Sequence, residues 1–181
     1  MRGASRNSRI NELERGDDDR WRSRFLETLE HAYHRAPHFE ATRALVKSIF
    51  DEPELNLAKW ITLSLRRLAE RLGIRTTILV NSAATPGLRH AGEGRIIEIC
   101  RRHGATRYVN AIGGKSLYNR VTYAENHVRL EFVRSELVRY RQFGTAFVPG
   151  LSVIDVLMFN APERITHDLF TYDLIVSDRV P

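Results

Sequence analysis

The sequence has one cysteine, few lysines and no long apolar run. The single cysteine, Cys100, excludes an internal disulfide and a metal site built from several cysteines. No apolar stretch approaches the roughly 18–20 residues of a membrane-spanning helix, and none follows the N-terminal Arg and Ser residues as it would in a secretory signal. These absences predict a cytoplasmic protein without a membrane span.

The length and composition predict one globular domain. The chain has 181 residues, of which 43% are hydrophobic and 28% charged, and domains usually hold about 100–200 residues. Residues 1–16 are polar and rich in Gly, Ser and Arg, so we expect a flexible arm or the remnant of a missing N-terminal module there. Residues 17–181 are expected to form the domain.

The positive charge comes almost entirely from arginine. The net charge is +6, and only three of the 28 basic residues are lysines: Lys47, Lys59 and Lys115. The arginines are scattered and interleaved with acidic residues, which is typical of a solvated surface. The charge suits an anionic small molecule as partner, whereas no basic cluster specifies nucleic acid.

The first half of the sequence predicts three helices. Apolar residues recur every three or four positions in each of them. Carboxylates at Asp17–Asp19 favour a helix start, and Pro37 ends that helix. The second helix is expected at Phe39–Phe50, and the third opens at Pro53 and stops at Gly73.

The second half predicts alternating strands and helices. Short β-branched or alternating runs indicate strands at Thr76–Val80, Tyr108–Ile112 and about Val128–Val133. Helices are expected at Arg95–His103, after Pro149-Gly150, and in an amphipathic stretch at Glu163–Tyr172. The fold class predicted is α/β, a Rossmann-like layered domain with a helical N-terminal half.

The segment from Tyr108 to Tyr118 is the first candidate ligand site. A strand that ends in two glycines lets backbone amides approach an anionic ligand closely. Gly114-Lys115-Ser116 resembles the end of a phosphate loop, but such a loop needs glycine where Val109 stands, so that interpretation fails. A ligand-facing loop and a structural tight turn both stay open. The ligand-binding candidates are Asn110, Gly113, Gly114, Lys115 and Tyr118.

Two further pairs are weaker candidates. Asn81 and Ser82 follow a predicted strand, and open α/β sheets bind ligands at the ends of their strands. Ser152 and Asp155 are polar residues at a predicted helix start, where the spacing of a capping box explains both without chemistry.

Metal and nucleophile sites are not indicated. His31, His34 and His38 are closely spaced, but Pro37 interrupts their helix and no acidic or cysteine partner has ligand spacing. Cys100 falls on the apolar side of its predicted helix, where a thiol behaves as a small hydrophobic group. No residue pattern specifies a cofactor or a catalytic residue.

Several segments together resemble the WbqC-like protein family of bacteria. The resemblance covers about Ile10 to Ile175, and its specificity lies in the order and spacing of the motifs. The matching segments are Trp21, Ala32-Tyr33, Ala36-Pro37, Phe39, Leu72-Gly73-Ile74, Asn81-Ser82, Arg107–Tyr123, Leu137–Phe143, Phe147-Val148-Pro149 and Leu151–Asn160.

The resemblance implies a role in surface-polysaccharide (O-antigen or capsule) or specialised-metabolite biosynthesis. A transferase-type enzyme acting on a nucleotide-linked sugar or similar precursor is the first expectation. The family begins with a strand and a His-Gln-Pro-x-Tyr-x-Pro-Trp motif that this sequence lacks, and Lys115 stands where many members have Gln. The alternative is therefore a non-catalytic accessory protein, or an inactive truncated relative, that oligomerises or needs a completing partner.

Overall fold

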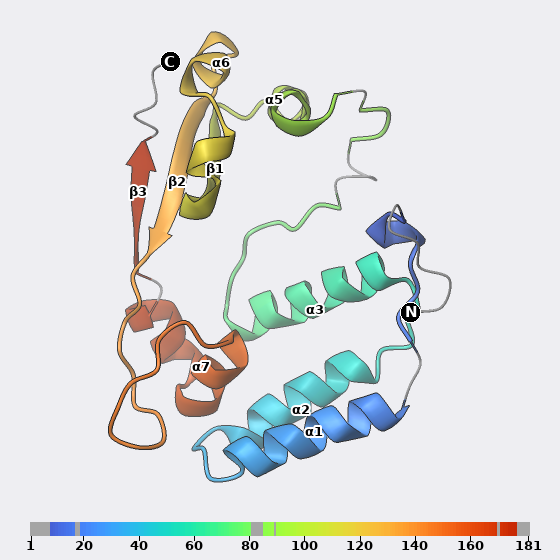
Figure 1. The fold of residues 1–181 in the computed structure, drawn as a ribbon, viewed down its shortest axis with the longest axis vertical. Helices are drawn as coiled ribbons and strands as arrows, with labels where there is room; N and C mark the ends of the chain where they lie inside the picture. The colour runs from blue at the N-terminus through green and yellow to red at the C-terminus, as the bar shows by residue number, and fades with distance from the viewer. Residues whose placement is uncertain (1–7, 17–18, 81–84, 89, 170, 177–181) are drawn as a thin grey trace. The chain divides into compact units, whose positions relative to one another are not determined.

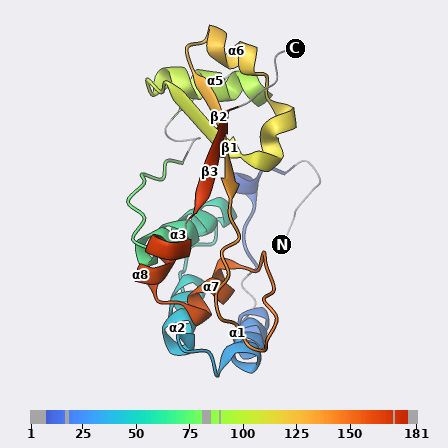
Figure 2. The same cartoon turned by 90° about the vertical axis from the view of Figure 1, so that its left-hand side faces the viewer.

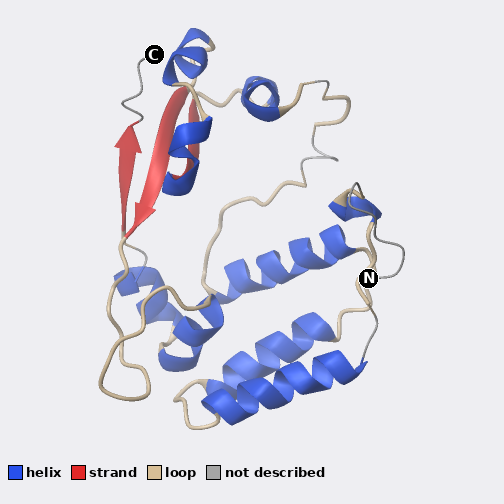
Figure 3. Cartoon of the chain, in the orientation of Figure 1, coloured by secondary structure: helices blue, strands red, loops and turns tan. Residues whose placement is uncertain are grey.

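The chain passes back and forth between two units. The structure, a computed structural model, describes residues 8–16, 19–80, 85–88, 90–169 and 171–176. The helical unit comprises Met1–Ile78 and Leu137–Leu169, and the sheet unit comprises Leu79–Glu136 and Phe170–Pro181 (Figure 1). The fold is mixed α/β, and every described strand belongs to the sheet unit (Figure 3). That the chain is a single domain stays a prediction.

The helical unit is built around α2. This helix contacts α1, α3 and α7 (Figure 2). The buried core of the helical unit is aromatic and aliphatic, and its residues come from both chain segments of the unit: Leu29, Ala36, Phe39, Val46, Phe50 and Met158. The elements are η1 (Ile10–Glu12), α1 (Asp19–Tyr33), α2 (Phe39–Phe50), α3 (Leu57–Arg71), α7 (Val153–Phe159), α8 (Pro162–Arg164) and a π-helical turn (Ile165–Leu169).

The three predicted N-terminal helices are confirmed, with one start corrected. The second helix has the predicted bounds, Phe39–Phe50. The third begins at Leu57 rather than near Pro53, because the Asn56 side chain caps it by accepting the Lys59 backbone N–H at 3.1 Å. Gly73 ends this helix as predicted, with a φ of +66° that glycine adopts without strain.

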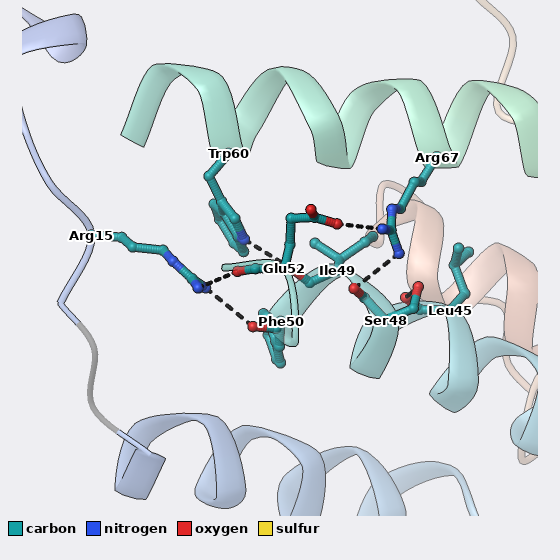
Figure 4. Close-up of polar contacts among 8 residues, drawn as sticks. All are labelled: Arg15, Leu45, Ser48, Ile49, Phe50, Glu52, Trp60 and Arg67. Carbon is teal, nitrogen blue, oxygen red and sulfur yellow. Dashed lines mark hydrogen bonds and ion pairs between the residues drawn. The ribbon is translucent and has the colours of Figure 1, made fainter. Parts of the chain in front are cut away.

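Side chains of α3 hold the C-terminus of α2 (Figure 4). The Trp60 indole N–H donates to the Ile49 carbonyl at 2.9 Å. Arg67 donates to the Ser48 carbonyl at 2.9 Å and forms an ion pair with Glu52. The last carbonyls of a helix lack helical partners and carry partial negative charge, so a guanidinium and an indole N–H satisfy them. These contacts fix α3 against α2.

A third contact to the same helix end comes from the segment before α1. Arg15 donates to the Phe50 carbonyl at 3.2 Å and to the Glu52 carbonyl, while its guanidinium lies over the Trp60 ring, 5.5 Å from the centroid (Figure 4). The Arg15 backbone N–H also donates to the Leu55 carbonyl at 2.8 Å. The segment that carries Arg15 is therefore anchored to the helical unit.

Among the described residues, the sheet unit holds three strands in the order β1-β2-β3. β1 (Arg107–Ala111) is parallel to β2 (Arg129–Ser135), and β3 (Tyr172–Val176) is antiparallel to β2. The described helical segments of the unit are α5 (Gly92–Arg102), η2 (Ile112–Leu117) and α6 (Arg120–Glu125).

The core of the sheet unit packs α5 and α6 against β2. Its buried members are Ile97, Cys100, Tyr123, Val128, Leu130 and Phe132. Cys100 is 5% exposed, and burial raises the pKa of its thiol, so the prediction that this residue is a buried hydrophobic group is confirmed.

One strand prediction and one helix prediction fail. Thr76–Val80 forms no strand, and Leu79 and Val80 are 57% and 40% exposed. A β-branched run needs a neighbouring strand, and no described strand pairs with this one. The stretch Glu163–Tyr172 was predicted as one amphipathic helix, but the helical turns end at Leu169 and β3 begins at Tyr172.

Candidate functional site

The predicted ligand loop follows β1 in the sheet unit. Asn110 lies in β1, the residues Gly113, Gly114 and Lys115 lie in η2, and Tyr118 comes directly after η2. The structure therefore keeps these five candidates on one short segment, in which Lys115 and Tyr118 are half-buried.

Asn110, Gly114 and Tyr118 are used inside the protein. The Asn110 side-chain oxygen accepts the Ala111 backbone N–H at 2.8 Å. A Cβ on Gly114 would lie 3.1 Å from Asn110 Nδ2 and 3.3 Å from Tyr118 Cε2, so this glycine allows close internal packing. The Tyr118 ring packs edge-on against Tyr108 at 5.9 Å. A ligand-binding role for the loop stays a prediction.

The two glycines are expected to respond differently to alanine. Gly113→Ala should change stability by less than about 0.5 kcal/mol, because a Cβ there meets nothing within 4 Å. Gly114→Ala should cost about 1–3 kcal/mol, because the added methyl group displaces the Asn110 and Tyr118 side chains. Thermal unfolding of both variants checks this, and equal melting temperatures would contradict it.

The weaker candidates, Asn81 with Ser82 and Ser152 with Asp155, have different outcomes in the structure. Asn81 and Ser82 lie outside the described residues, and the strand they were expected to follow is absent. Ser152 is the N-cap of α7, as predicted, and its Oγ accepts the Ile154 N–H at 3.2 Å. The carboxylate of Asp155 instead faces other elements of the helical unit, so the capping-box interpretation is wrong for this residue.

Asp155 is the centre of a buried polar cluster. Asp155 is 4% exposed. Its Oδ2 accepts the Tyr33 hydroxyl at 2.9 Å, and its Oδ1 accepts the Tyr140 hydroxyl at 2.6 Å and the Gln142 amide at 3.0 Å. A carboxylate buried in this way needs such donors, since each charged hydrogen bond offsets lost hydration.

Both tyrosines of the cluster stay protonated at neutral pH. Burial, followed by the hydrogen bond to Asp155, raises the pKa of Tyr33 to about 12. The same two causes raise the pKa of Tyr140 to about 12. The hydroxyls therefore act as donors that hold the carboxylate, and neither can take up a proton from a substrate at neutral pH.

Gln142 connects this cluster to a loop. Its amide nitrogen also donates to the Val148 carbonyl at 3.1 Å, and its amide oxygen accepts the Val148 N–H at 2.8 Å. One side chain thus binds Asp155 and closes the loop from residue 142 to residue 148, in which Gly144 has a φ of +82°. The position of this loop is set by the buried carboxylate.

A pocket of about 390 Å³ opens beside the loop, entirely within the helical unit. It is lined by Arg35, Pro37, Arg141, Gln142, Phe143, Gly144 and Phe159. The Arg35 guanidinium lies over the Phe143 ring at 5.7 Å, and the Phe143 and Phe159 rings meet edge-on at 4.8 Å. The pocket therefore has aromatic walls and two arginines.

Neither arginine of the pocket forms an ion pair with a described residue. Arg35 and Arg141 are both exposed, in contrast to Arg67, whose guanidinium is used by Glu52 and Ser48. Guanidinium groups without a carboxylate partner in a concave site are suited to phosphate or carboxylate ligands. This pocket is the candidate site that the geometry favours.

Sequence reasoning missed the pocket, although it named some of its neighbours. Tyr33, Leu137–Phe143 and Leu151–Asn160 all belong to the segments that carry the family resemblance. The structure brings these segments together across 122 residues between Tyr33 and Asp155. The segments that carry the family resemblance are therefore the ones that meet beside the pocket, and this is the sequence signal that could have indicated it.

Two classes of feature are absent from the described part of the chain. No group of three His, Cys, Asp or Glu side chains there is placed to hold a metal ion, and His31, His34 and His38 form no such group. No helix in those ranges has the length and apolar character needed to cross a membrane.

Comparison with known proteins gives one match. The model of the WbqC-like protein family matches residues 1–167. No curated protein and no solved structure matches the chain.

Proposed function

Because this chain belongs to the WbqC-like protein family, we propose that it is a transferase-type enzyme acting on an anionic precursor such as a nucleotide-linked sugar. The observation that carries the proposal is the pocket of the helical unit, where Arg35 and Arg141 have no acidic partner among the described residues. The reaction would belong to bacterial surface-polysaccharide or specialised-metabolite biosynthesis in the cytoplasm.

The pocket suits a diphosphate that carries a ring. Two guanidinium groups each offer a fork of N–H donors that matches phosphate oxygens. Phe143 and Phe159 supply apolar faces on which a sugar or base can lie. A volume of about 390 Å³ falls within the ordinary range of small-molecule sites.

Asp155 and Gln142 are positioning residues in this proposal. Asp155 is buried and its oxygens are occupied by Tyr33, Tyr140 and Gln142. Its contribution is to orient the Gln142 side chain, which lines the pocket.

Titration calorimetry with UDP-glucose tests the proposal. Arg35→Gln with Arg141→Gln should weaken binding about a hundredfold or more, since each charge-assisted hydrogen bond is worth about 1.5–3 kcal/mol. Arg139→Gln is the matched control: Arg139 is exposed on the same segment, stacks on Phe147 at 5.7 Å and does not line the pocket. Equal affinity of the double variant and the control would reject the pocket as the site.

A second candidate, a non-catalytic accessory protein completed by a partner, is favoured by the small sheet. In the described residues β1 and β3 each pair on one side only, which leaves edges that another strand can join. The Rossmann-like layout is likewise a proposal, supported by the parallel pair β1 and β2 with α6 between them in sequence. Release of UDP from UDP-glucose by the isolated chain would favour the enzyme.

A further inference from the structure

A second pocket, of about 480 Å³, lies in the sheet unit. Its lining comes from α6 and the turn after it, the first residues of β2 and the end of β3, and combines basic with apolar side chains: Arg120, Ala124, His127, Val128, Arg129, Leu130 and Val176. Val128 and Leu130 are 5% and 2% exposed, so they form a fixed apolar floor. The three basic side chains are all exposed.

His127 occupies a backbone position that favours glycine. The His127 N–H donates to the Ala124 carbonyl at 3.0 Å, and the Val128 N–H donates to the Tyr123 carbonyl at 3.0 Å. This pair of bonds ends α6 in a Schellman motif, whose residue with positive φ is usually glycine. His127 has a φ of 57°, and within the described ranges every other residue with positive φ is a glycine.

A histidine at this position adopts a left-handed backbone conformation that glycine takes most readily. A left-handed conformation costs a residue with a Cβ roughly 1–2 kcal/mol that glycine avoids. Strain of this kind is typical of residues whose side chains serve a site. His127 lines the pocket, so a ligand bound there could be contacted by its imidazole.

Two arginines, Arg120 and Arg129, line the same pocket. Arg120 has no ion-pair or hydrogen-bond partner among the described side chains. Arg129 forms an ion pair through Nε with Glu131 at 2.9 Å, and its guanidinium carries further N–H donors in a planar fork. Glu131 is 3% exposed and is also paired with Arg107, so it acts as a buried anchor that orients Arg129.

We propose that the sheet unit binds a phosphorylated small molecule with an apolar body in this pocket. The phosphate lies among Arg120, His127 and Arg129, which supply N–H donors and positive charge. The apolar body lies on Val128 and Leu130. This site is separate from the pocket of the helical unit, so the proposal does not depend on the function proposed above.

Phenyl phosphate is the probe, and NMR titration of the full chain is the measurement. We expect the amide signals of residues 120–130 to shift on titration, and Arg120→Gln to weaken binding about tenfold or more. His127→Gly should weaken binding in the same way while raising the melting temperature by about 2–4 °C, because glycine relieves the strain of a φ of 57°. Higher stability with lower affinity is an outcome that a purely structural histidine does not give.

The control is Arg134→Gln. Arg134 lies on the same strand at its other end, pairs with Asp173 on the surface and does not line the pocket, so its loss should leave affinity unchanged. Shifts confined to residues 120–130 with unchanged affinity in both Arg120→Gln and His127→Gly would overturn the proposal. Absence of any shift at these amides would overturn it as well, whereas a response to inorganic phosphate but not to phenol would support the phosphate as the group recognised.

Discussion

Replacing Asp155 by alanine is expected to lower the free energy of unfolding by about 3–5 kcal/mol, because three donors lose their acceptor. The Tyr33 and Tyr140 hydroxyls and the Gln142 amide all donate to this carboxylate, which is 4% exposed as a residue. Denaturant unfolding followed by tryptophan fluorescence is the suitable measurement, since both tryptophans of the chain belong to the helical unit.

Asp51→Ala is the control for this prediction. Asp51 is an exposed aspartate of the same unit that pairs with Lys47 four residues earlier, and such a pair contributes about 0.3–0.5 kcal/mol. A loss for Asp155→Ala no larger than that for Asp51→Ala would show that the cluster does not stabilise the unit.

The pH dependence of unfolding gives a second measure of the same cluster. The fold raises the pKa values of Tyr33 and Tyr140 from the ordinary 10.0 to about 12, so between these values the unfolded chain holds fewer protons. Stability contributed by the two tyrosines is thus complete below pH 10 and is lost as the pH rises toward 12. Asp155→Ala removes the contribution of Asp155 to both pKa shifts, so the decline should become shallower; an unchanged decline would contradict this.

Phe132→Ala is expected to cost about 3–5 kcal/mol, the range for removing a large buried aromatic side chain. Phe132 is 0% exposed on the central strand β2, opposite Asn110 on β1 and Ile175 on β3. Amide hydrogen exchange in β1 and β2 should accelerate by a factor of about 100–4,000, since each 1.4 kcal/mol is tenfold.

The control for the second prediction is Val109→Ala. Val109 lies next to Asn110 on β1 and is 40% exposed, so its truncation leaves no buried cavity and should cost under about 1 kcal/mol. Similar exchange rates in the two variants would mean that β2 is not the centre of the core.

Helices were predicted well because their signal is local. The apolar spacing predicts a helix at about Phe39 to Phe50, which agrees with α2, and Gly73 ends α3. Strands depend on a partner elsewhere in the chain, which is why Thr76–Val80 was assigned wrongly and β3, paired with a segment some 40 residues earlier, was missed.

The sites were predicted less well, for a related reason. Asp155 was named from the sequence, but its neighbour Tyr33 lies 122 residues away, and no spacing rule joins the two. Arg35 and Arg141 could not be distinguished from the other arginines until the structure showed which of them lack acidic neighbours. His127 gave no signal, because only the backbone geometry shows that glycine would be expected there.

The alternation of the chain between its two units has a consequence for synthesis on the ribosome. The core of the helical unit can form completely only after α7, which carries Met158, has been synthesised. The sheet of the other unit can form completely only after β3 (Tyr172–Val176) has been synthesised. From the synthesis of β2 until that of β3, some 40 residues later, β1 and β2 are therefore available with one flank of β2 uncovered, a state in which strands of nascent chains can associate. Slow elongation between these two strands would lengthen that exposure, and a nascent-chain chaperone that binds β2 would shorten it.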